Sequence, residues 1–292
     1  MGRPDLSVVV PVSTGCSRAA DAVAALLAST SEVAGEILLA DSSTDGSALE
    51  APASPRIRRL PLAAGCNAAA LRAAGILEAA GAVVALVEPW AIAQPGWGRS
   101  LLEGHARAGG DAVVGGPVLY GGTGGSASLA EFYFEYGAFL PPLTPEVTEL
   151  PVNNVSYSSA LLERFRSDWS RGFWKHFLHR RMRASGTKFF ASPGALVRHV
   201  REVPFLQFCR ERLDHGRAYA GLRESSRWRV LLAPVLPFLL TGRIARAVWS
   251  RPGARRPLVE ALPLLLAAEG AWAVGEALGC AAGGGDSASR VF

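Results

Sequence analysis

The sequence is poor in lysine and has no closely spaced cysteines. Only Lys175 and Lys188 are lysines among 30 basic residues, and the formal net charge is +5. Because arginine binds phosphate groups in a bidentate geometry, this excess indicates nucleotides or phospholipid headgroups as partners, with coding bias towards arginine as the alternative explanation. The four cysteines form no C-x-x-C pair, so neither a zinc site nor a disulfide framework is indicated, and a reducing compartment fits best. They are Cys16, Cys66, Cys209 and Cys280.

Other missing features narrow the class of protein further. No G-x-G-x-x-G follows the first apolar run and no G-x-x-x-x-G-K-[ST] occurs, which disfavours the dinucleotide-binding and P-loop classes. The apolar stretch at the N-terminus is too short for a signal-peptide core, so we expect a first strand there and a cytoplasmic location. We expect no nucleic-acid partner. With 49% hydrophobic residues over 292 residues, the chain can bury the core of one large domain, or of one domain plus an appendage.

The first half of the chain alternates strand-like and helix-like segments. Continuous β-branched or apolar runs predict buried strands, and alanine- and leucine-rich runs predict helices between them. The predicted strands are Leu6 to Val12, Glu36 to Ala40, Ile57 to Pro61, Val83 to Val87 and Ala112 to Gly116. The predicted helices are Arg18 to Ser29, Asn67 to Ala80 and Trp97 to Ala108. This alternation predicts an α/β fold with a mostly parallel, doubly wound sheet and flanking helices.

In sheets of this kind, ligands bind beyond the carboxyl ends of the strands. Those ends carry the segments Pro11 to Ser13, Asp41 to Ser47 and Glu88 to Trp90. The last of these follows an apolar run that ends abruptly in a carboxylate. We therefore expect Glu88 to hold a ligand.

Five segments, taken in order, resemble family 2 glycosyltransferases, whose nucleotide-sugar domain has the GT-A fold. The donor-side segments are SVVVPV, EILLADSSTDGS and GCNAAALRAAGILEAAGAVVALVEPWAIAQPGW. LPVNNVSYSSALLERF resembles the small acceptor-side strand and helix, and WKHFLHRRMRASGTKFFASPGALVRHV resembles the catalytic helix, glycine turn and final strand. The resemblance spans roughly Leu6 to Arg223. It implies transfer of a sugar from a nucleotide-diphosphate donor to a lipid-linked or glycan acceptor of the cell envelope.

The resemblance assigns the nucleotide-sugar side of the site. It implies that Asp41 accepts hydrogen bonds from the base or the ribose, and that Arg72 faces the nucleotide. The alternatives are an ordinary turn former at Asp41 and a solvated helix residue at Arg72. Pro11 ends the first strand, as a proline does in the family. Asp45 is expected beside the nucleotide, although the Asp-Gly pair that it forms with Gly46 favours a role in the turn itself.

The family usually neutralises the diphosphate with a divalent cation held by an acidic D-x-D element. Here that element reads Glu88, Pro89 and Trp90, and tryptophan offers no ligand to Mg²⁺ or Mn²⁺. The metal ligands that the resemblance leaves are Glu88 and His199, together with the diphosphate. Ribose binding by Glu88 and a structural role for His199 are the alternatives.

An inverting transfer needs a general base, normally an aspartate at the start of the catalytic helix. Trp174 and Lys175 occupy the positions expected for the Glu-Asp pair of the family. Lysine is protonated at neutral pH unless it is desolvated, so Lys175 fits a phosphate anchor better than a base, and Asp168 is the nearest acidic substitute. Asn153 and Asn154, with Trp174, are expected on the acceptor side, or the two asparagines only close a turn.

The C-terminal region differs in composition. We place a domain boundary between residues 224 and 225, with a GT-A-like domain over 1–224 and a hydrophobic, arginine-rich helical region with a flexible tail over 225–292. The apolar run WRVLLAPVLPFLL is shorter than the about twenty residues that span a bilayer, and the next run carries Glu260, Glu269 and Glu276, which are costly in hydrocarbon. If both runs spanned, the arginine-rich loop between them would lie on the side opposite the catalytic domain, against the positive-inside tendency of a cytoplasmic enzyme. A re-entrant or interfacial hydrophobic helical hairpin at the cytoplasmic face of the cell membrane, with its arginines at anionic headgroups, meets this objection. A helix pair packed on the main domain or on a partner subunit is the alternative.

Three functions follow from these observations. The first is a membrane-associated glycosyltransferase. The second is a catalytically impaired nucleotide-sugar-binding or scaffold protein with the same fold. The third is a nucleotidyltransferase, which is disfavoured because the expected glycine-rich first loop with arginine and lysine is absent.

Overall fold

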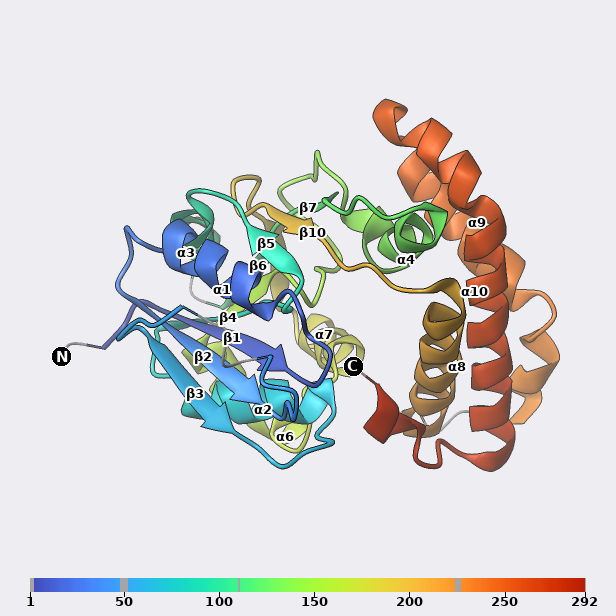
Figure 1. Cartoon of the computed structure of the whole chain (residues 1–292), viewed down its shortest axis with the longest axis horizontal. Helices are drawn as coiled ribbons and strands as arrows, with labels where there is room; N and C mark the ends of the chain where they lie inside the picture. The colour runs from blue at the N-terminus through green and yellow to red at the C-terminus, as the bar shows by residue number, and fades with distance from the viewer. Residues whose placement is uncertain (1–2, 48–51, 110, 224–226, 292) are drawn as a thin grey trace. The chain divides into compact units, whose positions relative to one another are not determined.

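The computed structural model describes residues 3–47, 52–109, 111–223 and 227–291, and the chain forms two compact units (Figure 1). Unit 1 comprises Met1–Gly121 and Pro141–Val200, and unit 2 comprises Gly122–Leu140 and Arg201–Phe292. Each unit has its own cluster of buried apolar side chains. We therefore describe the two units separately.

Unit 1 is built on a seven-stranded sheet with the strand order β3-β2-β1-β4-β8-β6-β9. The strands are β1 (Leu6–Val12), β2 (Gly35–Asp41), β3 (Ile57–Pro61), β4 (Val83–Leu86), β6 (Ala112–Gly115), β8 (Val155–Ser158) and β9 (Lys188–Ala191). β8 runs antiparallel to β4 and β6, whereas the other neighbouring pairs are parallel. The predicted α/β class with a mostly parallel sheet is confirmed at this level.

Helices cover both faces of this sheet, which explains why β1 is buried along its whole length. Figure 1 shows α1 (Ala19–Ser29) and α3 (Trp97–Ala108) on the opposite side of the sheet from α2 (Ala68–Glu78) and α6 (Arg166–Trp169). α2, α5 (Ser159–Arg164), α6 and α7 (Lys175–Ala184) share one buried cluster with β1, β2 and β4. Gly75 lets α2 lie close to β1, because a Cβ there would collide with Val9.

A second, three-stranded sheet extends unit 1. It has the order β5-β10-β7, with β5 (Ala91–Ala93), β7 (Val118–Tyr120) and β10 (Val197–His199). β10 is antiparallel to β5 and parallel to β7. This pairing brings the C-terminal part of the resemblance next to the segment that follows Glu88.

Unit 2 is helical. Its elements are α4 (Ser126–Tyr136), α8 (Phe205–Leu222), α9 (Leu236–Trp249) and α10 (Arg255–Ala282), with the 3-10 turns η1 (Gly137–Phe139), η2 (Arg227–Leu232), η3 (Pro252–Ala254) and η4 (Ser287–Arg290). α10 packs against α4, α8 and α9. Within the described residues, α10 is the one helix long and apolar enough to cross a membrane, by length and composition.

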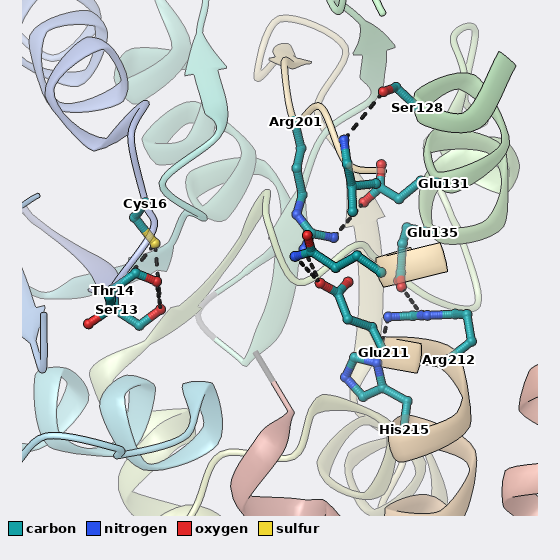
Figure 2. A network of polar contacts seen from close by, with 12 residues as sticks. Ser13, Thr14, Cys16, Ser128, Glu131, Glu135, Arg201, Glu211, Arg212 and His215 are labelled. Atoms are coloured by element: carbon teal, nitrogen blue, oxygen red, sulfur yellow. Dashed lines mark hydrogen bonds and ion pairs between the residues drawn. The ribbon is translucent and has the colours of Figure 1, made fainter. Parts of the chain in front are cut away.

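Charged side chains join α4 to α8 inside unit 2 (Figure 2). Arg201 donates to Glu131 at 3.4 Å and to Glu211 at 2.6 Å, and the buried Arg212 pairs with Glu135. The Arg212 guanidinium also lies over the ring of Phe134, 4.8 Å from its centroid. The network thus ties two helices that are far apart in the sequence.

Most elements predicted in the first half of the chain are confirmed to within two residues. β1, β3 and α3 have the predicted bounds. α2 begins one residue later than predicted, because Asn67 caps it and accepts a hydrogen bond from the Ala70 amide at 2.8 Å.

The compact units divide the chain elsewhere than at the expected boundary between residues 224 and 225. α4 and α8 lie in unit 2 with the C-terminal helices, because the charged network and the packing on α10 join them. The expected flexible tail forms η4, where Arg290 donates to Asp214 of α8 at 2.8 Å. The expected hairpin corresponds to α9 and α10, which pack on each other.

Candidate functional site

The carboxyl ends of the central strands of unit 1 form one edge. The parallel register sets Val12 opposite Asp41, and Asp41 opposite Pro61, so that β1, β2 and β3 end level with one another. β4 lies on the other side of β1 with Leu86 opposite Val9, and Glu88 follows two residues later. The sequence-predicted residues Pro11, Asp41 and Glu88 are therefore at or near one edge, where parallel sheets place ligands.

Asp41 is buried at the end of β2, and its carboxylate is held by three donors. Oδ1 accepts from the Ser43 amide at 2.9 Å and from the Ser43 hydroxyl at 2.6 Å, while Oδ2 accepts from Arg59 at 2.6 Å. Burial alone would raise the pKa of Asp41, but the hydrogen bonds from Ser43 and Arg59 outweigh it and lower the pKa. The group is a fixed anion. Because a carboxylate accepts about four hydrogen bonds, Oδ2 keeps acceptor capacity for a ligand.

The loops after β1 and β2 are latched together. Asp45 Oδ2 accepts from the Gly15 amide at 2.7 Å, and its Oδ1 accepts from the Ser47 hydroxyl at 2.6 Å. These hydrogen bonds lower the pKa of Asp45 to about 2. Gly46 has φ of 81°, a conformation that glycine adopts readily. The turn role that the Asp-Gly pair favours is confirmed, and Asp45 contributes to the edge by fixing its loops.

The loop after β1 also folds back on itself. Figure 2 shows Cys16 turned towards Ser13, whose amide donates to the sulfur at 3.5 Å. The Thr14 hydroxyl lies 3.0 Å from that of Thr44 in the loop after β2. Together with the hydrogen bonds of Asp45, these contacts fix the conformation of the loops that border the edge.

Glu88 holds Arg72. The two side chains form an ion pair in which Glu88 is 4% exposed and Arg72 is 12% exposed. Arg72 lies on α2, one turn after the residues that start the helix, and the alternative of a solvated helix residue is wrong. The Arg72 Nε atom is buried without a hydrogen-bonding partner among the described residues. The structure thus pairs two residues that the resemblance assigns to the nucleotide-sugar side of the site.

A buried Tyr157–His179 pair lies in the core beneath this edge. The Tyr157 hydroxyl and His179 Nε2 are 2.6 Å apart. Tyr157 belongs to the buried apolar cluster that α2 helps to form, and the His179 ring packs against the Tyr157 ring. Burial raises the pKa of Tyr157, an effect that the nearby charge of Arg72 partly offsets, and burial lowers the pKa of His179. Both groups are therefore neutral at pH 7. Both stand in segments that carry the resemblance, but the resemblance assigns a role to neither, and the sequence does not show that they meet.

The two asparagines before β8 differ sharply. Asn154 is fully used: its Oδ1 accepts from Trp97 at 2.9 Å, and its Nδ2 donates to the carbonyls of Pro117 and Ala195 at 3.1 and 2.7 Å. Asn153 is equally buried, yet neither its Oδ1 nor its Nδ2 has a hydrogen-bonding partner among the described residues. Val155 pairs with Leu86, so Asn153 enters β8 beside the exit of β4 that carries Glu88. Of the two predicted acceptor-side asparagines, Asn153 is the one with free capacity.

The residues predicted at the start of the catalytic helix lie around α7. Trp174 is the residue that precedes α7, and Lys175 donates to Glu149 at 2.9 Å and to the Leu150 carbonyl at 3.1 Å. Burial alone would raise the pKa of Glu149, but His176 and Lys175 hold it far below its usual range. Asp168 lies on α6, with its carboxylate 3.9 Å from Arg181. Lys175 is thus committed to an ion pair with Glu149, a partner that the sequence did not reveal.

The predicted metal ligands do not make a cation site with the residues described. Glu88 is neutralised by Arg72, and no group of three or more His, Cys, Asp or Glu side chains suited to a metal occurs in the described ranges. His199 is buried at the end of β10, opposite Ala91, so the structure does bring it near the segment that follows Glu88. A hard divalent ion needs several oxygen ligands, and this set supplies one carboxylate that already has a partner.

The fold and this edge define an α/β protein with charged and amide groups gathered at the carboxyl ends of a mostly parallel sheet. No protein-family model matches the chain, and no curated protein matches it either. What the edge binds is therefore inferred from its own side chains and from the motifs that they belong to.

Proposed function

We propose that this chain is a family 2-like glycosyltransferase with a GT-A fold. In this proposal it transfers a sugar from a nucleotide-diphosphate donor to a lipid-linked or glycan acceptor. The observation that carries the proposal is the convergence of Asp41, the Arg72–Glu88 pair and Asn153 at one sheet edge. These residues come from three separate motifs of the resemblance, and each supplies a group that a sugar nucleotide can use.

On the donor side, we assign base or ribose recognition to Asp41. Its carboxylate is fixed by Ser43 and Arg59 and stays ionised, so it accepts hydrogen bonds without reorganising. The latch between Gly15 and Asp45 holds the loops on either side. Because these loops are already ordered, less conformational entropy is lost when a nucleotide binds.

We assign the binding of the negatively charged diphosphate to Arg72. Its guanidinium is oriented by Glu88 and its side chain stays 12% exposed, so it can complement phosphate oxygens. In this assignment Glu88 positions Arg72 and does not bind a cation. Mg²⁺ or Mn²⁺ assistance, which the resemblance implies, is the competing assignment.

The second candidate function is a nucleotide-sugar-binding protein without transfer activity. The observation that favours it is Lys175, which stands where the family carries its base and is paired with Glu149. Asp168, the substitute base, lies within 4 Å of Arg181. The donor edge serves both functions equally, so only turnover separates them.

Calorimetry with a panel of nucleotide-diphosphate sugars tests the proposal. We expect one donor to bind wild-type protein and Asp41→Ala or Asp41→Asn to weaken its affinity about 10- to 100-fold, as loss of a hydrogen bond to a charged group does. Asp21→Ala, which removes an exposed carboxylate paired with Arg18 on α1, is the control and leaves affinity unchanged.

Donor hydrolysis or transfer to an added acceptor then decides between the two functions. Turnover supports the glycosyltransferase, and tight binding without turnover supports the binding protein. Failure of every donor to bind would overturn both.

A further inference from the structure

Exposed apolar side chains gather in one part of unit 2. Among the large hydrophobic residues that are exposed, most fall between residues 228 and 249, on η2, on α9 and on the short link between them. We call these residues the α9 face. They are Trp228, Leu231, Leu232, Val235, Phe238, Leu239 and Trp249.

The part of the α9 face that lies on α9 is one side of an amphipathic helix. Val235, Phe238, Leu239, Arg246 and Trp249 are exposed and recur at spacings of three, four or seven residues, which places them on one side of a helix. The opposite side carries Thr241 and Val248, which are buried. A Cβ on Gly137 would collide with Val248, so α9 packs tightly on the turn after α4. The exposed side is therefore left free by the packing of unit 2.

α10 is a weaker candidate for contact with lipid. Its glycines lie against α8, since a Cβ on Gly275 would collide with the Leu213 carbonyl and one on Gly279 would crowd Arg217. It also carries the buried Glu269, and Glu276 pairs with Arg223 at 2.6 Å. Leaving the unit to span a bilayer would break this pair and expose both carboxylates to hydrocarbon. α10 is thus the central helix of unit 2.

Exposed arginines border the α9 face. Arg243 and Arg246 lie on the second half of α9, and Arg255 and Arg256 follow η3. The Arg255 guanidinium lies 5.7 Å from the centre of the Trp249 ring. Exposed apolar side chains bordered by guanidinium groups match the layering of acyl chains and phosphates at a membrane surface.

We propose that the α9 face docks unit 2 onto an anionic lipid surface. Leu231, Phe238 and their neighbours enter the boundary between headgroups and acyl chains, and the arginines contact lipid phosphates. The charge of the arginines selects an anionic bilayer over a second copy of this chain, whose same face would bring like charges together. The inference refines the expected membrane hairpin to a surface on η2 and α9, and it does not depend on the chemistry of unit 1.

Vesicle sedimentation of the full-length protein tests the proposal. We expect binding to vesicles of phosphatidylcholine with phosphatidylglycerol, and much less to phosphatidylcholine alone. Leu231→Asp and Phe238→Asp should each weaken partitioning roughly tenfold or more, since a buried apolar side chain is exchanged for a charge. Leu206→Asp on α8 is the matched control, because Leu206 is 72% exposed and Leu231 is 79% exposed.

The contribution of the arginine charges is tested by the same vesicle sedimentation. Arg246→Ala should weaken binding about fivefold, whereas Arg210→Ala, an exposed arginine of α8, should leave it unchanged. Circular dichroism and donor binding of each variant report on folding and on unit 1 separately.

Three results would overturn the proposal. These are no binding of wild-type protein to anionic vesicles, equal losses in the α8 controls, and a wild-type dimer in the absence of vesicles that Leu231→Asp converts to a monomer. The last would assign the α9 face to a second copy of the chain.

Discussion

Both compact units bury charged side chains, but they do so in different places. In unit 1 the Arg72–Glu88 pair and the carboxylate of Asp41 lie where strands end, beside groups that retain hydrogen-bonding capacity. In unit 2, Arg201 and Arg212 pair with glutamates between packed helices and join α4 to α8. A buried ion pair therefore does not identify a binding site by itself. The pair in unit 1 is a candidate because it also lies at strand ends, where parallel sheets bind ligands.

Arg72→Ala should give the largest effect on stability. It leaves Glu88 buried without its partner, and breaking a buried pair in this way costs about 3 to 5 kcal/mol. Arg58→Ala removes an exposed pair with Glu78 and should cost at most about 1 kcal/mol. Urea unfolding of both variants measures the difference. Equal and small losses would mean that Glu88 is solvated and that the pair does not organise the edge.

The two asparagines before β8 should respond differently to alanine. Asn154→Ala removes three hydrogen bonds and takes the partner of the Trp97 indole and of the Ala195 carbonyl, whereas the Pro117 carbonyl keeps the Val197 amide, at a cost of about 2 to 3 kcal/mol. Asn153→Ala removes no hydrogen bond between described residues, so the free energy of unfolding should change by less than about 1 kcal/mol while ligand affinity falls. A large loss of stability in Asn153→Ala would show that its amide is structural.

Glu269→Gln should stabilise unit 2 at high pH. Burial raises the pKa of Glu269 from its ordinary 4.5 to about 8, although Arg212 and Arg243 oppose the rise. Between these two pH values the folded state keeps a proton that the unfolded state has released, so wild-type stability falls as the pH increases. Glutamine has no such penalty. The variant should therefore match wild type below pH 4.5 and exceed it on the order of 2 kcal/mol above pH 8.

Thermal unfolding at several pH values measures this gap. Glu260→Gln, on the exposed side of the same helix and paired with Arg256, is the control and should show little pH-dependent gain. A gap at Glu269 that stays constant with pH would contradict the raised pKa.

The sequence predicted the strand and helix order of unit 1 well, because buried parallel strands and alanine-rich helices have distinct periodicities. It also placed Asp41 and Glu88 at strand ends. It did not reveal the partner of Glu88, since the pairing with Arg72 depends on how α2 packs against the sheet. Nor did it distinguish Asn153 from Asn154, which are adjacent and of the same type but meet different neighbours.

Unit 2 was harder to predict for a related reason. Its residues come from two separated stretches of the chain, and the link between α4 and α8 is made by side chains such as Arg212 and Glu135. Composition marks the apolar C-terminal helices, but only packing shows that α10 is central and that α9 keeps an exposed apolar side.

In the proposed function, an arginine held by Glu88, and not a metal ion, meets the negative charge of a nucleotide-diphosphate sugar. Calorimetry of the wild-type protein with its preferred donor, in the presence of Mn²⁺ and in the presence of a chelator, tests this most directly. We expect the same affinity in both conditions, and loss of binding in Arg72→Ala under conditions where that variant remains folded. Donor binding that requires Mn²⁺ and survives in Arg72→Ala would contradict it.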